Sequence, residues 1–284
     1  MEWDVHGKTV LVTGASSGIG LEASIALARR GARVVMVGRD PGRIASATAA
    51  VASRAPGAEV ELIRSDFASQ ESVRSLAERV LSTYDRLDVL VNNAGTVNKR
   101  RRLTVDGIES TFAVNHLAPF LLTNLLLDRV VASAPARVVT VSSVGHLNAS
   151  LDFDDLGYER GYGVMKAYAR SKLCNVLFSS ELARRLPAEV TSNALHPGGV
   201  NTNIWSGAPT WAKPVIALLM RPSFITAEQG GSYLADLVAN PAYAALTGAY
   251  FDRDRAVPPS ARAQDPELAQ RLWDVSAKLV GLPA

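Results

Sequence analysis

The sequence alternates short runs rich in β-branched residues with longer amphipathic stretches. Short apolar runs of this kind are typical of strands buried on both faces, and their alternation with helices indicates a parallel sheet. The expected strands are Thr9–Val12, Arg33–Val37, Val60–Ile63, Val89–Val91, Val138–Val141, Val190–Leu195 and Gly248–Phe251. The expected helices are Gly20–Arg30, Gly42–Ser53, Gln70–Tyr84, Val105–Val131 and Gly161–Leu186. The sequence therefore predicts an α/β fold: one doubly wound domain over residues 1–284, with a central parallel sheet of about seven strands flanked by helices.

Composition limits the class of protein. Hydrophobic residues make up 48% of the chain and charged residues 20%, as in globular proteins with a buried core. The net charge of +3 is too small to indicate a nucleic-acid partner. Cys174 is the only cysteine, and the four histidines lack ligand spacing, so we expect neither a disulfide nor a metal site.

The apolar segments also bear on location. The polar residues 1–6 do not form a signal peptide, and they run straight into the first expected strand. The longest clean apolar run of the later chain, Val215–Met220, is too short to cross a bilayer. We therefore expect a cytoplasmic protein without a transmembrane anchor.

A glycine-rich loop directly follows the first expected strand and opens a helix. Glycines allow a tight turn and close approach of a pyrophosphate, while the helix N-terminus offers free N–H groups. The spacing departs from the GxGxxG form, but the order of strand, loop and helix is the required one. The loop therefore predicts a dinucleotide site in a Rossmann-type domain, with Gly14, Ser16, Ser17, Gly18, Ile19 and Gly20 as cofactor-binding residues.

The end of the second expected strand indicates which dinucleotide binds. An acidic side chain here accepts bonds from a ribose 2′-hydroxyl, whereas an arginine pairs with a 2′-phosphate. Gly38-Arg39 favours NADP. Asp40 is a competing signal for NAD, although Asp40-Pro41 is also typical of a helix cap.

Two tyrosine–lysine pairs, Tyr162/Lys166 and Tyr168/Lys172, each have the four-residue spacing that places both side chains on one helix face. A lysine beside a phenol favours the phenolate, which allows proton exchange near neutral pH. A shift of six residues turns a helix by about 240°, so the two pairs face different ways. Only one pair is expected to face a given active site.

In their order along the chain, these motifs resemble the short-chain dehydrogenase/reductase family. The markers are Thr13-Gly14-x3-Gly18-x-Gly20, Asp66, Asn92-Asn93-Ala94-Gly95, Asn115, Ser143, Tyr168/Lys172, and Pro197-Gly198 with Thr202. The resemblance implies a cofactor-binding set that adds Asp66, Phe67, Asn93, Ala94, Gly95, Tyr168, Lys172, Pro197, Gly198, Val200 and Thr202 to the loop residues and Arg39. It also implies a homodimer or homotetramer built through the two long helices.

Finer features are similar to the retinol-dehydrogenase-like branch. They include Val114-Asn115-His116-Leu117, Tyr168-x-x-Ser171-Lys172-Leu173-x-Asn175, and the 25 positions that separate Ser143 from Tyr168. Members of this branch interconvert apolar carbonyls and alcohols. The resemblance therefore implies an NADP-dependent oxidoreductase that moves a hydride between nicotinamide and a carbonyl or alcohol carbon. The alternatives are a catalytically silent NADP-binding sensor or scaffold and a pigment-type C=C reductase.

The resemblance assigns catalytic roles to four residues. Tyr168 exchanges a proton with the substrate oxygen, and Lys172 lowers the tyrosine pKa and binds the nicotinamide ribose. Ser143 hydrogen-bonds the substrate oxygen, while Asn115 holds a helix distortion and a proton-relaying water. Ser143 is favoured over Ser142 by its second place in Val-Ser-Ser, and Tyr168 over Tyr162 by its matching neighbours.

Three further segments carry open questions. Ile204–Pro222 is rich in tryptophan and apolar residues, which indicates a lid over a hydrophobic substrate; an amphipathic helix on the core or on a dimer partner is the alternative. The basic run Lys99–Arg102 either steers an anion or is a solvated surface. His146 lies either at the substrate mouth or in an exposed loop.

Overall fold

The computed structural model describes residues 3–200 and 224–283. In these residues the main sheet has the strand order β10-β9-β6-β5-β4-β1-β2-β3, and every pairing is parallel except β10 with β9. Its strands are β1 (Thr9–Thr13), β2 (Arg33–Gly38), β3 (Val60–Arg64), β4 (Val89–Asn92), β5 (Ala136–Val141), β6 (Val190–His196), β9 (Tyr250–Asp252) and β10 (Arg255–Ala256). The predicted α/β fold is confirmed, with seven parallel strands and one short antiparallel addition. A separate parallel pair joins β7 (Gly199–Val200) to β8 (Phe224–Ile225).

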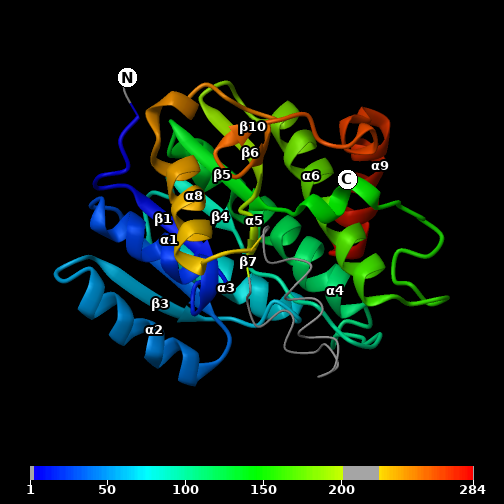
Figure 1. The fold of residues 1–284 in the computed structure, drawn as a ribbon, viewed down its shortest axis with the longest axis horizontal. Coiled ribbons are helices and arrows are strands. Elements are labelled where there is room, and N and C mark those ends of the chain that lie inside the picture. Colours follow the sequence, from blue (N-terminus) through cyan, green and yellow to red (C-terminus); the bar gives the residue numbers. More distant parts are fainter. Residues whose placement is uncertain (1–2, 201–223, 284) are drawn as a thin grey trace.

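Helices cover both faces of the sheet because its strands are apolar on both sides. Val10 and Val12 of β1 belong to one core cluster, and Leu11 between them belongs to the other. The first cluster contains α1 (Gly18–Arg29), α2 (Pro41–Arg54) and α8 (Ala227–Ala239); the second contains α3 (Gln70–Thr83), α5 (Ala118–Ala132), α6 (Val164–Arg185) and α9 (Pro266–Leu279). Figure 1 shows α8 in orange lying along α1 in blue.

The predicted helix Val105–Val131 is wrong at its beginning. Gly107 has a φ of +75°, which a right-handed helix does not allow. The helix starts only at α4 (Ser110–Phe112). The buried Glu109 carboxylate caps it by accepting hydrogen bonds from the backbone N–H groups of Thr111 and Phe112, both at 2.8 Å. The helix continues through a π-helical turn, η1 (Ala113–Leu117), into α5. The stretch Ser110–Ala132 is long and apolar enough to cross a membrane, and most of it is buried inside this fold.

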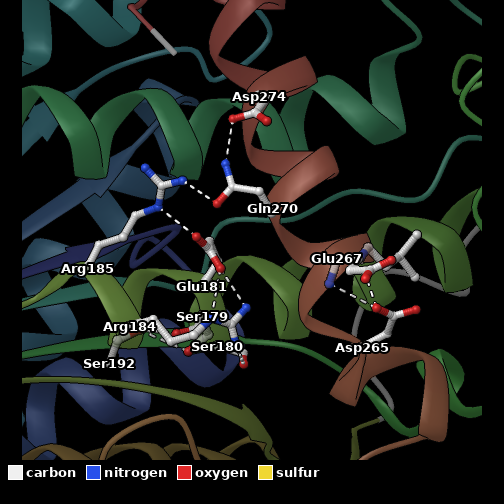
Figure 2. Close-up of polar contacts among 11 residues, drawn as sticks. Ser179, Ser180, Glu181, Arg184, Arg185, Ser192, Asp265, Glu267, Gln270 and Asp274 are labelled. Carbon is white, nitrogen blue, oxygen red and sulfur yellow. Dashed lines mark hydrogen bonds and ion pairs between the residues drawn. The ribbon is translucent and has the colours of Figure 1, made fainter.

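The C-terminal helix α9 lies against α5 and α6. Trp273 of α9 packs against Phe120 and Phe178, with ring centres 4.9 and 5.9 Å apart. At the end of α6, the buried Glu181 carboxylate accepts hydrogen bonds from Arg184 and Arg185, and Arg185 also donates to Gln270 of α9 (Figure 2). Helix α9 therefore covers part of the surface of the two long helices.

Strand order places the functional site. The sheet runs β1-β2-β3 in one direction and β4-β5-β6 in the other, so the chain changes direction between β1 and β4. In open parallel sheets, ligands bind beyond the carboxyl ends of strands at such a point. The Gly14–Gly20 loop follows β1, Asn93–Gly95 follows β4, and Ser143 follows β5.

Candidate active site

The glycine loop is packed so closely that side chains are excluded from it. A Cβ on Gly20 would lie 2.4 Å from Asn93 Nδ2 and 2.5 Å from the carbonyl oxygen of Gly14. Gly14 has a φ of +65°, and a Cβ there would meet Ala94 Cα at 2.8 Å. Asn93 locks this arrangement, because its Nδ2 donates to the carbonyl of Thr13 at 2.8 Å. Only glycine therefore fits at positions 14 and 20, where the loops after β1 and β4 meet.

The beginning of α1 suits an anion. Ser17 precedes the helix, makes no side-chain cap, and the first turn of α1 contains no acidic residue. The first N–H groups of the helix are thus left for another acceptor, and the helix dipole favours a negative charge there. Gly18, with a φ of +58°, makes the turn into the helix. The cradle therefore fits the pyrophosphate of a dinucleotide, near the half-buried Ser16 and Ile19.

The ends of β2 and β3 place Arg39 beside Asp66. The nearest guanidinium and carboxylate atoms of these two residues are 3.8 Å apart, and both side chains are exposed. Asp40 points to other partners: it caps α2 by accepting a hydrogen bond from the Arg43 backbone N–H at 2.8 Å. Asp40 is thus engaged as a helix cap, whereas the exposed Arg39 guanidinium lies within ion-pair distance of Asp66 at this edge. Phe67, which follows Asp66, is buried.

Ser143 and Tyr168 converge beyond the end of β5. A Cβ on Gly145 would lie 3.6 Å from Ser143 Oγ and 3.8 Å from Tyr168 Cε1, which places both side chains on one side of that glycine. Ser142 points elsewhere, because its buried hydroxyl donates to the carbonyl of Lys172 at 2.7 Å. Of the two serines, only Ser143 has its hydroxyl beside Tyr168.

Lys172 lies one helical turn after Tyr168 and is buried. Its Nζ is 5.7 Å from the centre of the Tyr168 ring and donates to the carbonyl of Val141 at 3.0 Å. Burial lowers the pKa of Lys172 to about 8. Burial also raises the pKa of Tyr168, and the Ser143 side chain only partly opposes this. Loss of hydration therefore dominates the pKa of Tyr168 in the protein alone. The expected lowering of that pKa by Lys172 stays a prediction.

Asn115 lies within the π-helical turn η1, as the expected helix distortion requires. Its Oδ1 accepts from the Thr96 N–H at 2.7 Å, and its Nδ2 donates to Ser171 Oγ at 2.9 Å. The position of a Cβ on Gly95 is 3.5 Å from Asn115 Oδ1 and 3.7 Å from Lys172 Nζ. The loop after β4 therefore approaches the Asn115 amide and the Lys172 ammonium at Gly95, with space between them for about one methyl group.

The second tyrosine–lysine pair does not form on a helix. Tyr162 precedes α6 and donates its hydroxyl to the carbonyl of Asn98 at 2.8 Å, whereas Lys166 is exposed. In the basic run, Arg101 donates to the carbonyl of Gly157 at 2.9 Å. Tyr162 and Arg101 therefore both fasten the loop that precedes α6.

The remaining expected residues follow strand β6 along the chain. Pro197 is buried, and Gly198 has a φ of +100° with its Cβ position only 2.5 Å from Ile225 Cδ1. Val200 ends β7. Thr202 and the expected lid Ile204–Pro222 lie outside the described residues. Among the described residues, no group of three His, Cys, Asp or Glu side chains could hold a metal ion.

Thr13 begins the family's loop motif, but the sequence assigned it no role in the site. Its Oγ1 accepts from the backbone N–H groups of Asn93 at 2.9 Å and Ala94 at 3.0 Å, and donates to the carbonyl of Val91 at 3.1 Å. These bonds fix the β4 loop against β1. A threonine directly before the first loop glycine is the only signal that the sequence offers for this role.

Comparisons with known proteins agree with this geometry. Residues 8–213 match the family model described as short chain dehydrogenase. Human retinol dehydrogenase 13 is 42% identical over 290 residues, covering 99% of this chain and 86% of that protein. A solved structure from Mycobacterium paratuberculosis is 33% identical with a TM-score of 0.80, covering 100% of this chain and 97% of the other. The Pseudomonas aeruginosa RhlG/NADP active-site complex is 27% identical with a TM-score of 0.71, covering 88% and 96%.

Proposed function

Because this chain belongs to the short-chain dehydrogenase family, in its retinol-dehydrogenase-like branch, we propose that it uses NADP to interconvert an apolar carbonyl compound and its alcohol. Oxidoreductase activity on CH–OH or C=O groups with a nicotinamide cofactor follows from the family. The observation that carries the proposal is the convergence of Ser143, Tyr168 and Lys172 beyond β5, beside a glycine cradle shaped for a dinucleotide.

In this proposal the bound nicotinamide supplies or accepts the hydride. Ser143 Oγ donates a hydrogen bond to the substrate oxygen, stabilising negative charge as it develops. Tyr168 gives its phenolic proton to that oxygen during reduction and removes it during oxidation. The raised pKa of Tyr168 keeps the phenol protonated near neutral pH, as a proton donor requires. The Lys172 ammonium would bind the ribose hydroxyls of the cofactor. Asn115, whose side chain is bonded to Thr96 and Ser171, would hold the helix distortion and a water that returns protons.

Arg39 supports NADP as the cofactor. Its exposed guanidinium lies at the carboxyl end of β2, where it would offer a 2′-phosphate the strong charge-assisted bonds that arginine provides. Asp40, the competing signal for NAD, is already hydrogen-bonded to the start of α2. The similar RhlG structure is itself a complex with NADP.

Exposed apolar side chains support a hydrophobic substrate. Val144 and Leu147 follow Ser143 and are 44% and 51% exposed, and Met165, one turn before Tyr168, is 47% exposed. Large apolar side chains next to catalytic groups gain stability when a hydrophobic molecule covers them. The match to retinol dehydrogenase 13 points to the same substrate class.

Location and assembly complete the proposal. We infer a cytoplasmic location, which the burial of most of Ser110–Ala132 inside the fold supports. If it forms a homodimer or homotetramer, the contact uses a surface other than the face of α5 and α6 that α9 covers.

The test is turnover with a panel of apolar aldehydes, ketones, quinones and cyclic enones, with NADPH and NADH supplied separately. We expect NADPH-dependent formation of an alcohol from apolar carbonyls, with product identity determined by mass spectrometry. Saturation of a C=C bond would show the pigment-type reductase instead. Tight NADPH binding without oxidation by any compound would show the silent sensor.

A further inference from the structure

We propose that His146 is a positioning residue that fixes Ser143 through its ring and thereby couples the substrate-binding serine to the C-terminal segment. The inference rests on the proposed function, in which Ser143 binds the substrate oxygen. His146 is fully buried, although the sequence suggests either a place at the substrate mouth or an exposed loop.

Both ring nitrogens of His146 are hydrogen-bonded to the backbone. Nε2 accepts from the Ser260 N–H at 3.1 Å, and Nδ1 lies 2.8 Å from the carbonyl oxygen of Ser143. An amide N–H can only donate, so Nε2 must be unprotonated and the hydrogen must be on Nδ1. His146 is therefore a neutral ring that donates to Ser143, and burial lowers its pKa in agreement with that state.

These bonds fix the serine from two sides. The Ser143 carbonyl accepts from the His146 backbone N–H at 3.1 Å as well as from the ring. The Ser143 hydroxyl accepts from the Gly145 N–H at 3.2 Å, which leaves its own hydrogen for another acceptor. The His146 ring is thus a long-range support for the short 3-10 helix η2 (Val144–Asn148) that Ser143 begins.

The other end of the support belongs to the C-terminal part of the chain. Ser260 begins the 3-10 turn η6 (Ala261–Gln264), which leads into α9. Arg262 of that turn donates to the carbonyl of Ala149 at 2.8 Å, and the Tyr250 ring lies 4.7 Å from the His146 ring. The C-terminal segment therefore buttresses the serine turn through His146 and Arg262.

Two isosteric replacements of His146 separate its two bonds. The amide of His146→Asn reaches the place of Nδ1 and can still donate to Ser143, whereas the amide of His146→Gln reaches the place of Nε2 and can still accept from Ser260. Each variant loses one buried hydrogen bond, so we expect similar losses of thermal stability. We expect kcat to stay within about threefold of wild type in the Asn variant and to fall at least about tenfold in the Gln variant, because small displacements of a reacting group cost large factors in rate. NADPH affinity, measured by fluorescence, should be unchanged in both.

A second pair of variants, at Ser260, tests the C-terminal end of the same contact. Ser260 has a φ of −57°, which proline also adopts, so Ser260→Pro removes the N–H while Ser260→Ala removes only the capping hydroxyl. We expect the Pro variant alone to release the ring from its Nδ1–H tautomer, as read from the nitrogen chemical shifts of His146, and to lower kcat.

The outcomes are separable. Wild-type protein without any turnover would overturn the proposed function and this inference with it. An active wild type in which the Asn and Gln variants lose kcat equally, in proportion to stability, would overturn the inference alone. Nitrogen chemical shifts that show hydrogen on Nε2 of His146 in the active wild type would also overturn the inference alone.

Discussion

The Lys172 ammonium donates to the main-chain carbonyl of Val141 at 3.0 Å, which fastens helix α6 to the end of strand β5. Asn175, one turn later, donates its side-chain amide to the same oxygen at 3.0 Å. The two bonds fix the position of α6 along its axis relative to the end of β5. The position of Tyr168 relative to Ser143 follows from this contact, because Tyr168 lies on the same helix and Ser143 follows the same strand.

The deprotonation of Lys172 should change the free energy of unfolding with pH. Burial lowers its pKa from 10.5 to about 8, so between these values the unfolded chain binds more protons than the folded one. The burial cost is fully present below pH 8 and is relieved as the pH rises toward 10.5. The unfolding free energy of wild type minus that of Lys172→Met should therefore rise over this range, by about 3 kcal/mol at most. Denaturant titrations at pH 7.5 and 10 measure it; a pH-independent difference would contradict the burial of a charged lysine.

Tyr168→Phe should abolish turnover and leave NADPH binding unchanged. The replacement removes the phenolic proton, while the ring still fills its half-buried place. Tyr162→Phe is the matched control, since it removes a hydroxyl that donates to the Asn98 carbonyl, away from Ser143. It should alter substrate KM at most. Loss of kcat in the Tyr162 variant alone would overturn the assignment.

Gly20→Ala should abolish cofactor binding and destabilise the protein. Its methyl group would lie 2.4 Å from Asn93 Nδ2, so the loops after β1 and β4 must separate. Gly42→Ala is the control at the start of α2, where the nearest atom is Asp40 Oδ1 at 3.3 Å. We expect the control to stay within about 1 kcal/mol of wild type, because alanine favours helix. Calorimetric binding of NADPH and thermal unfolding distinguish the two; equal behaviour would argue against the close packing of the cradle.

Arg39→Leu should weaken NADPH binding by about 10- to 100-fold, the size expected for loss of a charge-assisted contact with a phosphate. NADH binding should change little, because NADH lacks the 2′-phosphate. Arg43→Leu removes another exposed arginine, from the next helix, and serves as the control. An equal loss for both cofactors would contradict recognition of the 2′-phosphate by Arg39.

Glu181→Ala should destabilise the protein by about 1–2 kcal/mol. The buried carboxylate holds Arg184 and Arg185, which can turn toward water once it is removed, so the loss stays below that of a fully buried ion pair. Gln270→Ala breaks the exposed end of the same network and should cost less than about 0.5 kcal/mol. Denaturant unfolding of the two variants measures the difference; equal losses would show that burial of Glu181 contributes nothing.

Local patterns predicted the strands and the cofactor loop because those features depend on neighbouring residues. The runs around Val10, Val34 and Val138 are apolar on both faces, and the structure places them in the parallel sheet as expected. The start of the first long helix was misplaced, since the apolar pattern begins at Val105 but Gly107 and the Glu109 cap determine where a helix can begin. A side-chain cap is a three-dimensional contact that periodicity does not reveal.

The sequence by itself determined the α/β fold, the glycine cradle and the order of the catalytic motifs, since each is encoded in short spacings and backbone preferences. The tertiary structure decided which tyrosine meets a serine, that burial raises the pKa of Tyr168, and that His146 joins Ser143 to Ser260. The reason is physical: hydration and hydrogen-bond partners depend on groups far apart along the chain. Ser143 and Ser260 are brought together only when the C-terminal segment packs beside α6.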